Sequence, residues 1–395
     1  MSTIRPFTER IKRHYGSNDY IENENQNWVS IIQQLKPAKP LYILFPQLIT
    51  QNARAFAQAF PGKALYAVKT NPDPNAIKAI MAGGIKNFDV ASLEEIRLVH
   101  SMCPQAEMHF MHPIKTPEDI RSAYFDYGIR HFVLDHEDEL YKIMRETDLA
   151  QDLHLTVRIA CPKNDSALID FSSKFGANRE DAIMLLQHCR SVSKTLGISF
   201  HVGTQTEQSA RYAMAIHYSA AIIRESGINV DSINIGGGYP VAYQGDKNIP
   251  THKDCIDSAL QALKEEQLED LNLLAEPGRA LVANGAKLVT RVELRKDDML
   301  YINDGVYGGL FDAAKWVDTL FPTTAISCDR PFDGDTTPYR LSGPTCDSLD
   351  MMNGPFTLPS DIDMGDWIVF DNVGAYSQAI RGNFNGFGHA DVICI

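Results

Sequence analysis

Ala64-Leu-Tyr-Ala-Val-Lys-Thr-Asn-Pro72 joins an apolar, strand-like run to a turn, and Lys69 stands at the junction. A lysine that closes a buried strand is destabilising unless its charge is neutralised, paired with a carboxylate or used covalently. The run is the first of several similar β-rich runs, which recur at spacings typical of a strand followed by a helix. They are Ala64–Val68, Lys86–Val90, Glu107–Met111, His131–Leu134, His154–Ile159, Ile198–Val202, Ser232–Ile235 and Leu271–Ala275.

The segments between these runs have the apolar periodicity of helices. Examples are Pro74–Met81, Ser92–His100, Pro117–Asp126 and Arg179–Leu196. Regular alternation of strands and helices predicts a parallel sheet, and eight such units close naturally into a (β/α)8 TIM-type barrel, here over residues 40–280. A doubly wound open sheet is the alternative architecture.

The sequence pattern changes after Arg279, where helical periodicity becomes scarce. Residues 281–395, with 1–39 added, are predicted to form a β-sandwich or β-barrel domain. Pro, Gly and Asp are dense in 329–338 and 353–366, which we therefore expect to be surface loops. The strand-like runs between the turns are Lys287–Leu294, Met299–Asn303, Thr337–Ser342 and Trp367–Phe370.

The chain is acidic, with a formal net charge of −13 over 395 residues. This balance, without any Lys/Arg-rich run, argues against nucleic acid or an anionic membrane surface as a partner. We expect a cytoplasmic protein, because no signal-type apolar segment begins the chain and no stretch is apolar enough to cross a membrane. The cysteines are widely spread without a Cys-x-x-Cys pair, which disfavours both a disulfide framework and a zinc site.

In barrel enzymes the functional side chains lie at the C-terminal ends of the strands and on the loops that follow. Several polar side chains of this chain fall at such positions, so they are predicted to share one site. They are Lys69, Asp89, Asp135, Arg158, His201 and Glu276, together with the turn Gly236–Gly238.

These residue types suit a phosphorylated, cationic aromatic cofactor. Three glycines after a strand let backbone N–H groups surround an anion, and Arg279 offers a charged partner for it. Glu276 follows an apolar run, and a buried carboxylate needs a cation such as a protonated pyridine nitrogen. With Lys69 as a covalent anchor and His201 as a stacking ring, the simplest cofactor is pyridoxal 5′-phosphate (PLP). Each feature taken singly also has a structural explanation. The glycines can form a tight strand exit, Glu276 an ordinary ion pair, and His201 a buried core residue.

Several short motifs also follow one another in the order found in one enzyme family. From about residue 40 to 390 the chain resembles the fold type III PLP-dependent decarboxylases, whose barrel is like that of alanine racemase. Gly-Pro-Thr-Cys-Asp points to the ornithine decarboxylase branch, with a bacterial-type pattern and lysine/ornithine enzymes close by. The matching motifs are Tyr-Ala-Val-Lys-Thr-Asn (66–71), Phe-Asp-Val-Ala-Ser (88–92), Phe-His-Val-Gly (200–203), Ile-Gly-Gly-Gly-Tyr-Pro (235–240), Ala-Glu-Pro-Gly-Arg (275–279), Asn-Asp-Gly-Val-Tyr-Gly (303–308), Gly-Pro-Thr-Cys-Asp-Ser-Leu-Asp (343–350), Gly-Ala-Tyr (374–376) and Phe-Asn-Gly-Phe (384–387).

The resemblance implies a role for each matching residue. Lys69 would hold PLP covalently, His201 would stack on its ring, and Glu276 would pair with its ring nitrogen. The residues implied around the phosphate are Thr204, Gly236, Gly237, Gly238, Arg279 and Tyr376, and those implied in support of the lysine and cofactor are Asp89, Glu95 and Arg158.

The resemblance also implies substrate contacts. Cys346 would return a proton after carbon dioxide leaves, and Asp347 would receive the distal ammonium of the substrate. In this family both residues reach the pocket of the opposite subunit, so a homodimer with shared active sites is implied. Tyr307, from Asn-Asp-Gly-Val-Tyr-Gly, is a further substrate-binding candidate.

The chain departs from the family pattern in a few places. Thr204 stands for a serine and Gln205 for a common glycine. Lys315-Trp316 falls where eukaryotic ornithine decarboxylases carry a Tyr-Asp pair that helps to bind the distal amine. Asp312, placed as in bacterial members, is the candidate replacement.

Together these features predict decarboxylation of a basic L-amino acid, with L-ornithine to putrescine first and L-lysine to cadaverine second. The alternatives are a decarboxylase of an N-acylated ornithine from siderophore biosynthesis, an alanine-racemase-like isomerase, and a regulator that no longer binds PLP. A racemase of this type would pair its ring nitrogen with an arginine, so Glu276 argues against it.

Overall fold

The computed structural model describes residues 27–161, 174–327 and 329–395. The chain divides into two compact units, which we call the barrel unit and the β unit. The barrel unit comprises Ile49–Ala242 and Asp246–Val282, less the segment outside the description. The β unit comprises the described residues up to Leu48, together with Tyr243–Gly245 and Ala283–Ile395.

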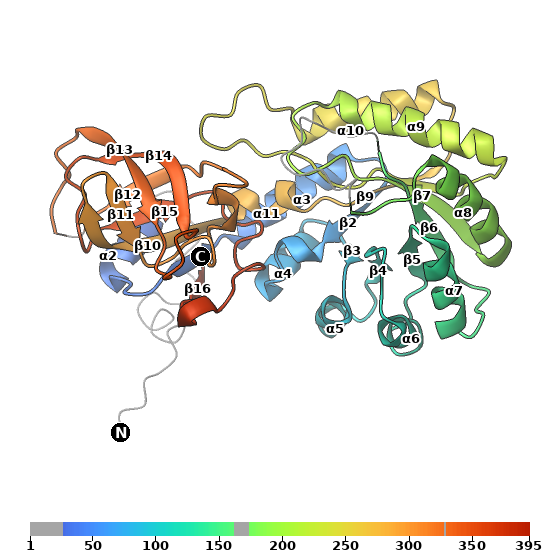
Figure 1. Ribbon diagram of the computed structural model, residues 1–395, viewed down its shortest axis with the longest axis horizontal. Coiled ribbons are helices and arrows are strands. Elements are labelled where there is room, and N and C mark those ends of the chain that lie inside the picture. The colour runs from blue at the N-terminus through green and yellow to red at the C-terminus, as the bar shows by residue number, and fades with distance from the viewer. Residues whose placement is uncertain (1–26, 162–173, 328) are drawn as a thin grey trace. The chain divides into compact units, whose positions relative to one another are not determined.

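The barrel unit is built on a closed, all-parallel sheet, in which β2 pairs with β9 to complete the ring (Figure 1). All the predicted barrel strands are present, so the (β/α)8 barrel is confirmed and the open sheet is excluded. The strands are β2 (Lys63–Ala67), β3 (Asn87–Val90), β4 (Glu107–Phe110), β5 (His131–Leu134), β6 (His154–Arg158), β7 (Thr195–Ser199), β8 (Ser232–Asn234) and β9 (Asn272–Ala275).

Helices follow the strands, and side chains at their first residues fix where they begin. The Asp73 carboxylate accepts from the Asn75 N–H, with Pro74 next in the chain, and the Ser92 hydroxyl accepts from the Glu95 N–H. Such caps satisfy amide groups that the helix itself leaves unpaired. The helices are α3 (Pro46–Ala59), α4 (Pro74–Ala82), α5 (Leu93–Met102), α6 (Pro117–Phe125), α7 (Glu137–Glu146), α8 (Arg179–Val192), α9 (Ala210–Ser226), α10 (His252–Glu265) and α11 (Arg279–Val282).

One predicted helix was too long. We expected it to run to residue 196, but α8 ends at Val192 and β7 begins at Thr195. Parallel pairing fixes where the strand begins, because His154 and Thr195 are register partners at the start of β6 and β7. The apolar periodicity of a helix and of a buried strand overlap over so short a segment.

The β unit holds one mixed, curled sheet with α2 (Asn27–Leu35) packed against it. β1 pairs antiparallel with β10 and parallel with β16, and Ile31, Ile43 and Val369 belong to the core so formed. The strands are β1 (Leu41–Leu44), β10 (Ala286–Lys296), β11 (Met299–Ile302), β12 (Thr323–Ile326), β13 (Thr336–Ser342), β14 (Met351–Pro359), β15 (Trp367–Phe370) and β16 (Asp391–Cys394).

The expected loop at 353–366 was partly wrong, because its first half belongs to β14. This strand pairs only with β13 in the sheet path, and proline and glycine are tolerated in such an edge strand. The units divide at Leu48 and Val282, where we had placed boundaries near 40 and 280. β1 sits in the sheet of the β unit, which accounts for the later first boundary. Residues 1–26, assigned to the β domain from sequence, lie outside the described part of the chain.

No described helix is both long and apolar enough to cross a membrane.

Candidate active site

Lys69 lies in a short 3₁₀ turn, η1 (Val68–Thr70), immediately after β2. Its Nζ donates to Oδ2 of Asp89, the third residue of β3, across 2.6 Å. The Asp89 side chain is almost fully buried, whereas the lysine remains partly exposed. The lysine charge is therefore paired, as its position after a buried strand required, while the amine stays within reach of a bound molecule.

Glu276 follows β9 and accepts a 2.7 Å hydrogen bond from the side-chain amide of Asn234 on β8. Protein atoms surround its carboxylate, and this burial raises the pKa of Glu276 to about 7. Nearby Asp89 raises the pKa further, while Lys69 and Arg158 oppose the effect. Among the described residues, none forms an ion pair with Glu276. The site thus holds a carboxylate that a cationic group would stabilise.

His201 lies just beyond β7, and its Nδ1 accepts a 3.0 Å hydrogen bond from the Gly203 N–H. This bond assigns the ring proton to Nε2. Burial, with smaller contributions from the positive charges of Arg158 and Lys69, lowers the pKa of His201 to about 3. The imidazole is therefore neutral and held in a fixed orientation, which suits stacking on a flat ring.

The glycine turn after β8 brings these groups together. Gly236 and Gly238 have φ angles of +68° and +97°, a region that favours glycine. A Cβ on Gly237 would lie 2.6 Å from the Glu276 carbonyl oxygen and 3.3 Å from His201 Nε2. The Tyr212 hydroxyl donates to the Gly237 carbonyl across 2.8 Å. The turn is both a tight strand exit and a rigid cradle that places backbone beside the other two groups.

The departure at Gln205 has a structural explanation. Its φ is +53°, in the left-handed region that favours glycine. The side-chain amide exchanges two hydrogen bonds with the Val241 backbone, at 2.8 and 2.9 Å. These bonds offset the strain and tie the Thr204 loop to the segment after the glycine turn.

The other predicted residues of the barrel unit lie near the same end. Arg158 closes β6, and the largely buried Arg279 begins α11. Glu95 accepts from the Ala91 N–H across 2.7 Å, and Asp135 accepts from the Gly176 N–H across 2.8 Å. Both acids therefore support loops in this structure.

The remaining predicted residues belong to the β unit. The Tyr307 hydroxyl donates to Oδ2 of Asp347, and the exposed Cys346 is anchored by its N–H, 3.1 Å from Oδ1 of Asn385. The Tyr307 contact, followed by the Leu349 N–H, lowers the pKa of Asp347 below its ordinary value. Asp312 is buried in the turn η3 (Phe311–Ala313).

Tyr376 has a φ of +54°. Such a conformation is uncommon for a bulky residue and concentrates at functional positions. This observation marks the residue independently of any motif.

A lysine, a carboxylate in need of a cation and a glycine cradle at one end of a barrel define a PLP-dependent enzyme. Residues 47–283 match the family model described as pyridoxal-dependent decarboxylase, pyridoxal binding domain. The chain belongs to this family, the fold type III PLP-dependent decarboxylases of the ornithine/lysine decarboxylase group. It is a PLP-dependent amino-acid decarboxylase.

Individual proteins agree with this assignment. The chain is 30% identical to the lysine/ornithine decarboxylase of Selenomonas ruminantium, covering 83% of this chain and 82% of that protein. The crystal structure of a lysine/ornithine decarboxylase from Vibrio vulnificus with putrescine superposes with a TM-score of 0.78 and 31% identity, over 94% of this chain and 99% of that one. The arginine decarboxylase of Paramecium bursaria Chlorella virus bound to agmatine gives a TM-score of 0.81 and 29% identity, over 93% and 98%.

Sequence reasoning missed Asn234, which holds the Glu276 carboxylate. A signal was present, because Asn234 directly precedes Ile-Gly-Gly-Gly and lies two residues after Ser232, on the same face of β8.

Proposed function

We propose that this enzyme decarboxylates a basic L-amino acid, L-ornithine to putrescine first and L-lysine to cadaverine second. The observation that carries the proposal is Asp347. It lies next to Cys346 in the chain, and its contact with Tyr307 favours the ionised form. A fixed carboxylate is the natural partner for a distal ammonium group. Relatives named as lysine/ornithine and arginine decarboxylases support a basic substrate.

Each residue of the barrel site is proposed to have a separate role toward PLP. PLP supplies an electron sink for the carbon–carbon bond electrons. Lys69 Nζ, oriented by Asp89, would hold the cofactor covalently. Glu276, whose direction Asn234 fixes, would pair with the protonated ring nitrogen. His201 would stack on the ring.

Backbone amides and basic side chains are proposed to bind the phosphate group of PLP. Gly236, Gly237 and Gly238 let amides approach the anion, with Thr204 and Arg279 as further barrel-unit candidates, and the family resemblance assigns Tyr376 of the β unit to the same phosphate. Arg158 contributes positive charge near Glu276 and His201.

The last step is a proton transfer to the substrate Cα. The Cys346 thiol is the assigned donor from Sγ, with Asp347 and Tyr307 beside it and Asp312 as the candidate second carboxylate for the distal amine. A thiol is an effective proton donor when its environment stabilises the thiolate that remains.

A second candidate substrate is an N-acylated ornithine. Trp316 is 53% exposed, with its ring 6.1 Å from that of Phe311, and Lys315-Trp316 falls where the resembled eukaryotic ornithine decarboxylases carry a Tyr-Asp pair. An exposed indole can cover an acyl group through apolar contact, and it lacks the carboxylate that a Tyr-Asp pair offers to an ammonium group.

Carbon dioxide release by the PLP-loaded enzyme distinguishes these substrates. The panel is L-ornithine, L-lysine, L-arginine, diaminopimelate and an N-acylated L-ornithine. We expect the highest kcat/KM with L-ornithine and the next with L-lysine. Turnover of the acylated compound alone would replace the proposal with the second candidate.

We further propose a homodimer in the cytoplasm, with Cys346 and Asp347 entering the partner's active site. Large apolar side chains are exposed in the β unit near these residues: Leu349 follows Asp347 by two positions, and Phe384 and Phe387 lie on either side of Asn385, whose Oδ1 accepts from the Cys346 N–H. Exposed apolar patches of this kind mark interaction surfaces. Mixing the inactive Lys69→Ala protein with the impaired Cys346→Ala protein should restore part of the activity, because one site of a mixed dimer is then intact. No recovery after verified subunit exchange would contradict shared sites.

A further inference from the structure

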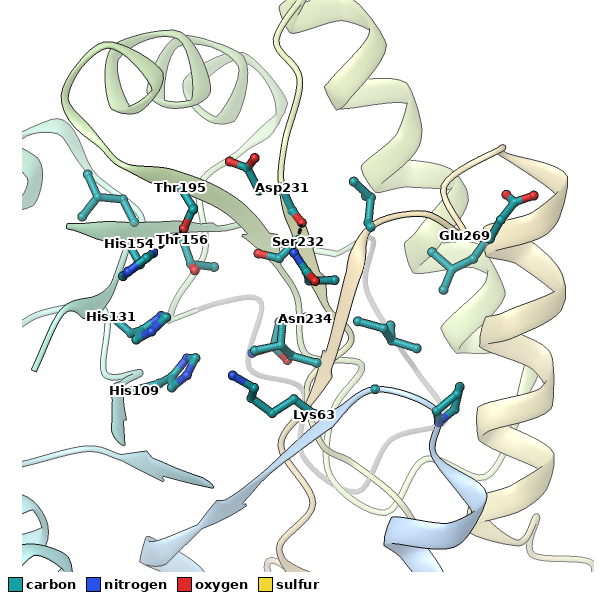
Figure 2. Close-up of a pocket in the computed structure, with 18 of the residues that line it drawn as sticks. Lys63, His109, His131, His154, Thr156, Thr195, Asp231, Ser232, Asn234 and Glu269 are labelled. Carbon is teal, nitrogen blue, oxygen red and sulfur yellow. Dashed lines mark hydrogen bonds between the residues drawn. The ribbon is translucent and has the colours of Figure 1, made fainter. Parts of the chain in front are cut away.

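A cavity of about 560 Å³ opens at the N-terminal end of the barrel strands (Figure 2). Lys69 and the other cofactor groups follow the C-terminal ends of the same strands, so this cavity is a separate place in the barrel. Its wall includes the first residues of successive strands, namely Lys63, His131, His154, Thr195, Ser232 and Asn272.

Three histidines form a column along one wall of this cavity. His109 and His131 are register partners on β4 and β5, and His131 and His154 are partners on β5 and β6. Their rings are stacked, with centroids 3.8 Å and 4.3 Å apart. Figure 2 shows the column, with Lys63 pointing toward it. Parallel pairing thus sets three imidazoles side by side on neighbouring strands.

A carboxylate from β4 meets two of the imidazoles. Oε1 of Glu107 lies 2.8 Å from His109 Nε2 and 3.5 Å from His131 Nε2. All three potential ligand atoms lie within 4.8 Å of one another. The imidazole of His131 has no hydrogen bond to any described residue, so its Nε2 has only the longer approach to Glu107. His154 is engaged differently, because its Nδ1 lies 2.6 Å from the Thr195 hydroxyl.

We propose that Glu107, His109 and His131 bind one divalent transition-metal ion at this cavity. Two imidazoles and one carboxylate are the donor set of zinc and non-haem iron sites, whereas magnesium and calcium prefer oxygen ligands alone. Water from the cavity supplies the remaining ligands. The ligand atoms already gather around Glu107 Oε1, and the stacked imidazole planes turn out of parallel when both Nε2 lone pairs face one ion. The site rests on the barrel unit alone and is independent of the substrate proposal.

Lys63 controls access to this site. Its Nζ donates to both Glu107 oxygens, at 2.7 and 2.8 Å, so the ammonium now occupies the place that the metal ion would take. The Lys63 side chain is 42% exposed and is free to swing into the cavity. Metal binding therefore displaces the ammonium, and removing its charge should tighten binding.

Cobalt(II) titration of the chelator-treated, PLP-loaded enzyme tests the proposal, with visible d–d absorption and equilibrium dialysis as readouts. We expect one bound cobalt ion per chain, displaced by zinc(II). His131→Gln should weaken binding by at least about tenfold. The matched control is His217→Gln, because His217 also contacts a glutamate, Glu266, but on the surface. Equal binding by the two variants, or no stoichiometric binding by the wild type, would overturn the site.

A second variant guards against a folding defect in His131→Gln. Lys63→Met keeps the length of the side chain and all three ligands, and its PLP absorption and thermal unfolding report whether it folds. We expect it to bind cobalt(II) several-fold more tightly than the wild type. Unchanged or weaker binding by folded Lys63→Met would contradict the placement of the ion at Glu107.

Discussion

Lys69 and Asp89 form a 2.6 Å ion pair between the ends of two neighbouring barrel strands, and the second oxygen of Asp89 is buried without a hydrogen-bond partner among the described residues. The pair holds the amine in place while leaving it accessible. We expect Asp89→Asn to lower kcat about 10- to 100-fold, the value of one charged hydrogen bond. Steady-state carbon dioxide release measures this.

The control for that variant is Asp257→Asn, which breaks the exposed Lys253–Asp257 pair on α10. Its activity should equal that of the wild type, since an exposed ion pair contributes little. If Asp89→Asn were as active as this control, the positioning role of Asp89 would be rejected.

The raised pKa of Glu276 makes the stability of the apoenzyme depend on pH. Its folded-state pKa is about 7, above the ordinary 4.5, so the folded protein binds this proton more tightly than the unfolded chain does. The resulting stability is present at low pH and is lost as the pH rises between these two values. Relative to Glu276→Gln, the wild-type apoenzyme should lose on the order of 1–3 kcal/mol over that interval.

Urea unfolding of both apoproteins at several pH values measures this difference. PLP should abolish it for the wild type, because a cationic ring nitrogen then stabilises the ionised carboxylate. If the free energy of unfolding changed with pH in the same way for the wild-type and Glu276→Gln apoproteins, the pKa of Glu276 would not be raised by burial.

Cys346 is the assigned proton donor, and its substitution should change the products as well as the rate. General acid catalysis contributes about 100-fold or more, so Cys346→Ala should lower kcat to that extent and produce an aldehyde by-product from misplaced protonation. Cys394→Ala, also at an exposed cysteine of the β unit, is the control. A normal yield of diamine from Cys346→Ala would reject the role.

Gln205 provides a test of backbone strain near the cofactor. Gln205→Ala loses two hydrogen bonds and keeps the left-handed backbone, so we expect a destabilisation of about 2–3 kcal/mol. Gln205→Gly loses the same bonds but adopts φ of +53° without strain, so its destabilisation should be smaller by about 1 kcal/mol. Urea denaturation of the holoenzymes compares them. Equal losses would mean that strain at this position is negligible.

Much of the barrel was predictable because strand and helix periods differ and repeat regularly. The end of α8 was not, since only the pairing of Thr195 with His154 shows where the strand starts. The positions of Lys69, Asp89, His201 and Glu276 followed from the rule that barrel sites form at the C-terminal strand ends. The bond from Asn234 to Glu276 depends on neighbouring strands being in register, which a single sequence does not reveal.

The histidine column illustrates the same limit. Judged by its cysteines, the chain carries no zinc signature, and the donors of the proposed metal site were not recognised from the sequence. His109, His131 and His154 are one strand-helix unit apart in sequence, and the parallel pairing of β4, β5 and β6 makes them adjacent. Regular spacing of a ligand residue at the barrel repeat is the signal that would have identified them.

The most direct test of the central claim is to locate the covalent attachment of PLP. The loaded enzyme is reduced with borohydride, digested, and its pyridoxyl-labelled peptide sequenced by mass spectrometry. We expect the label on Lys69 and on no other lysine, and none in Lys69→Ala. A label on another lysine, such as the buried Lys115 of the same barrel, would contradict the site described above.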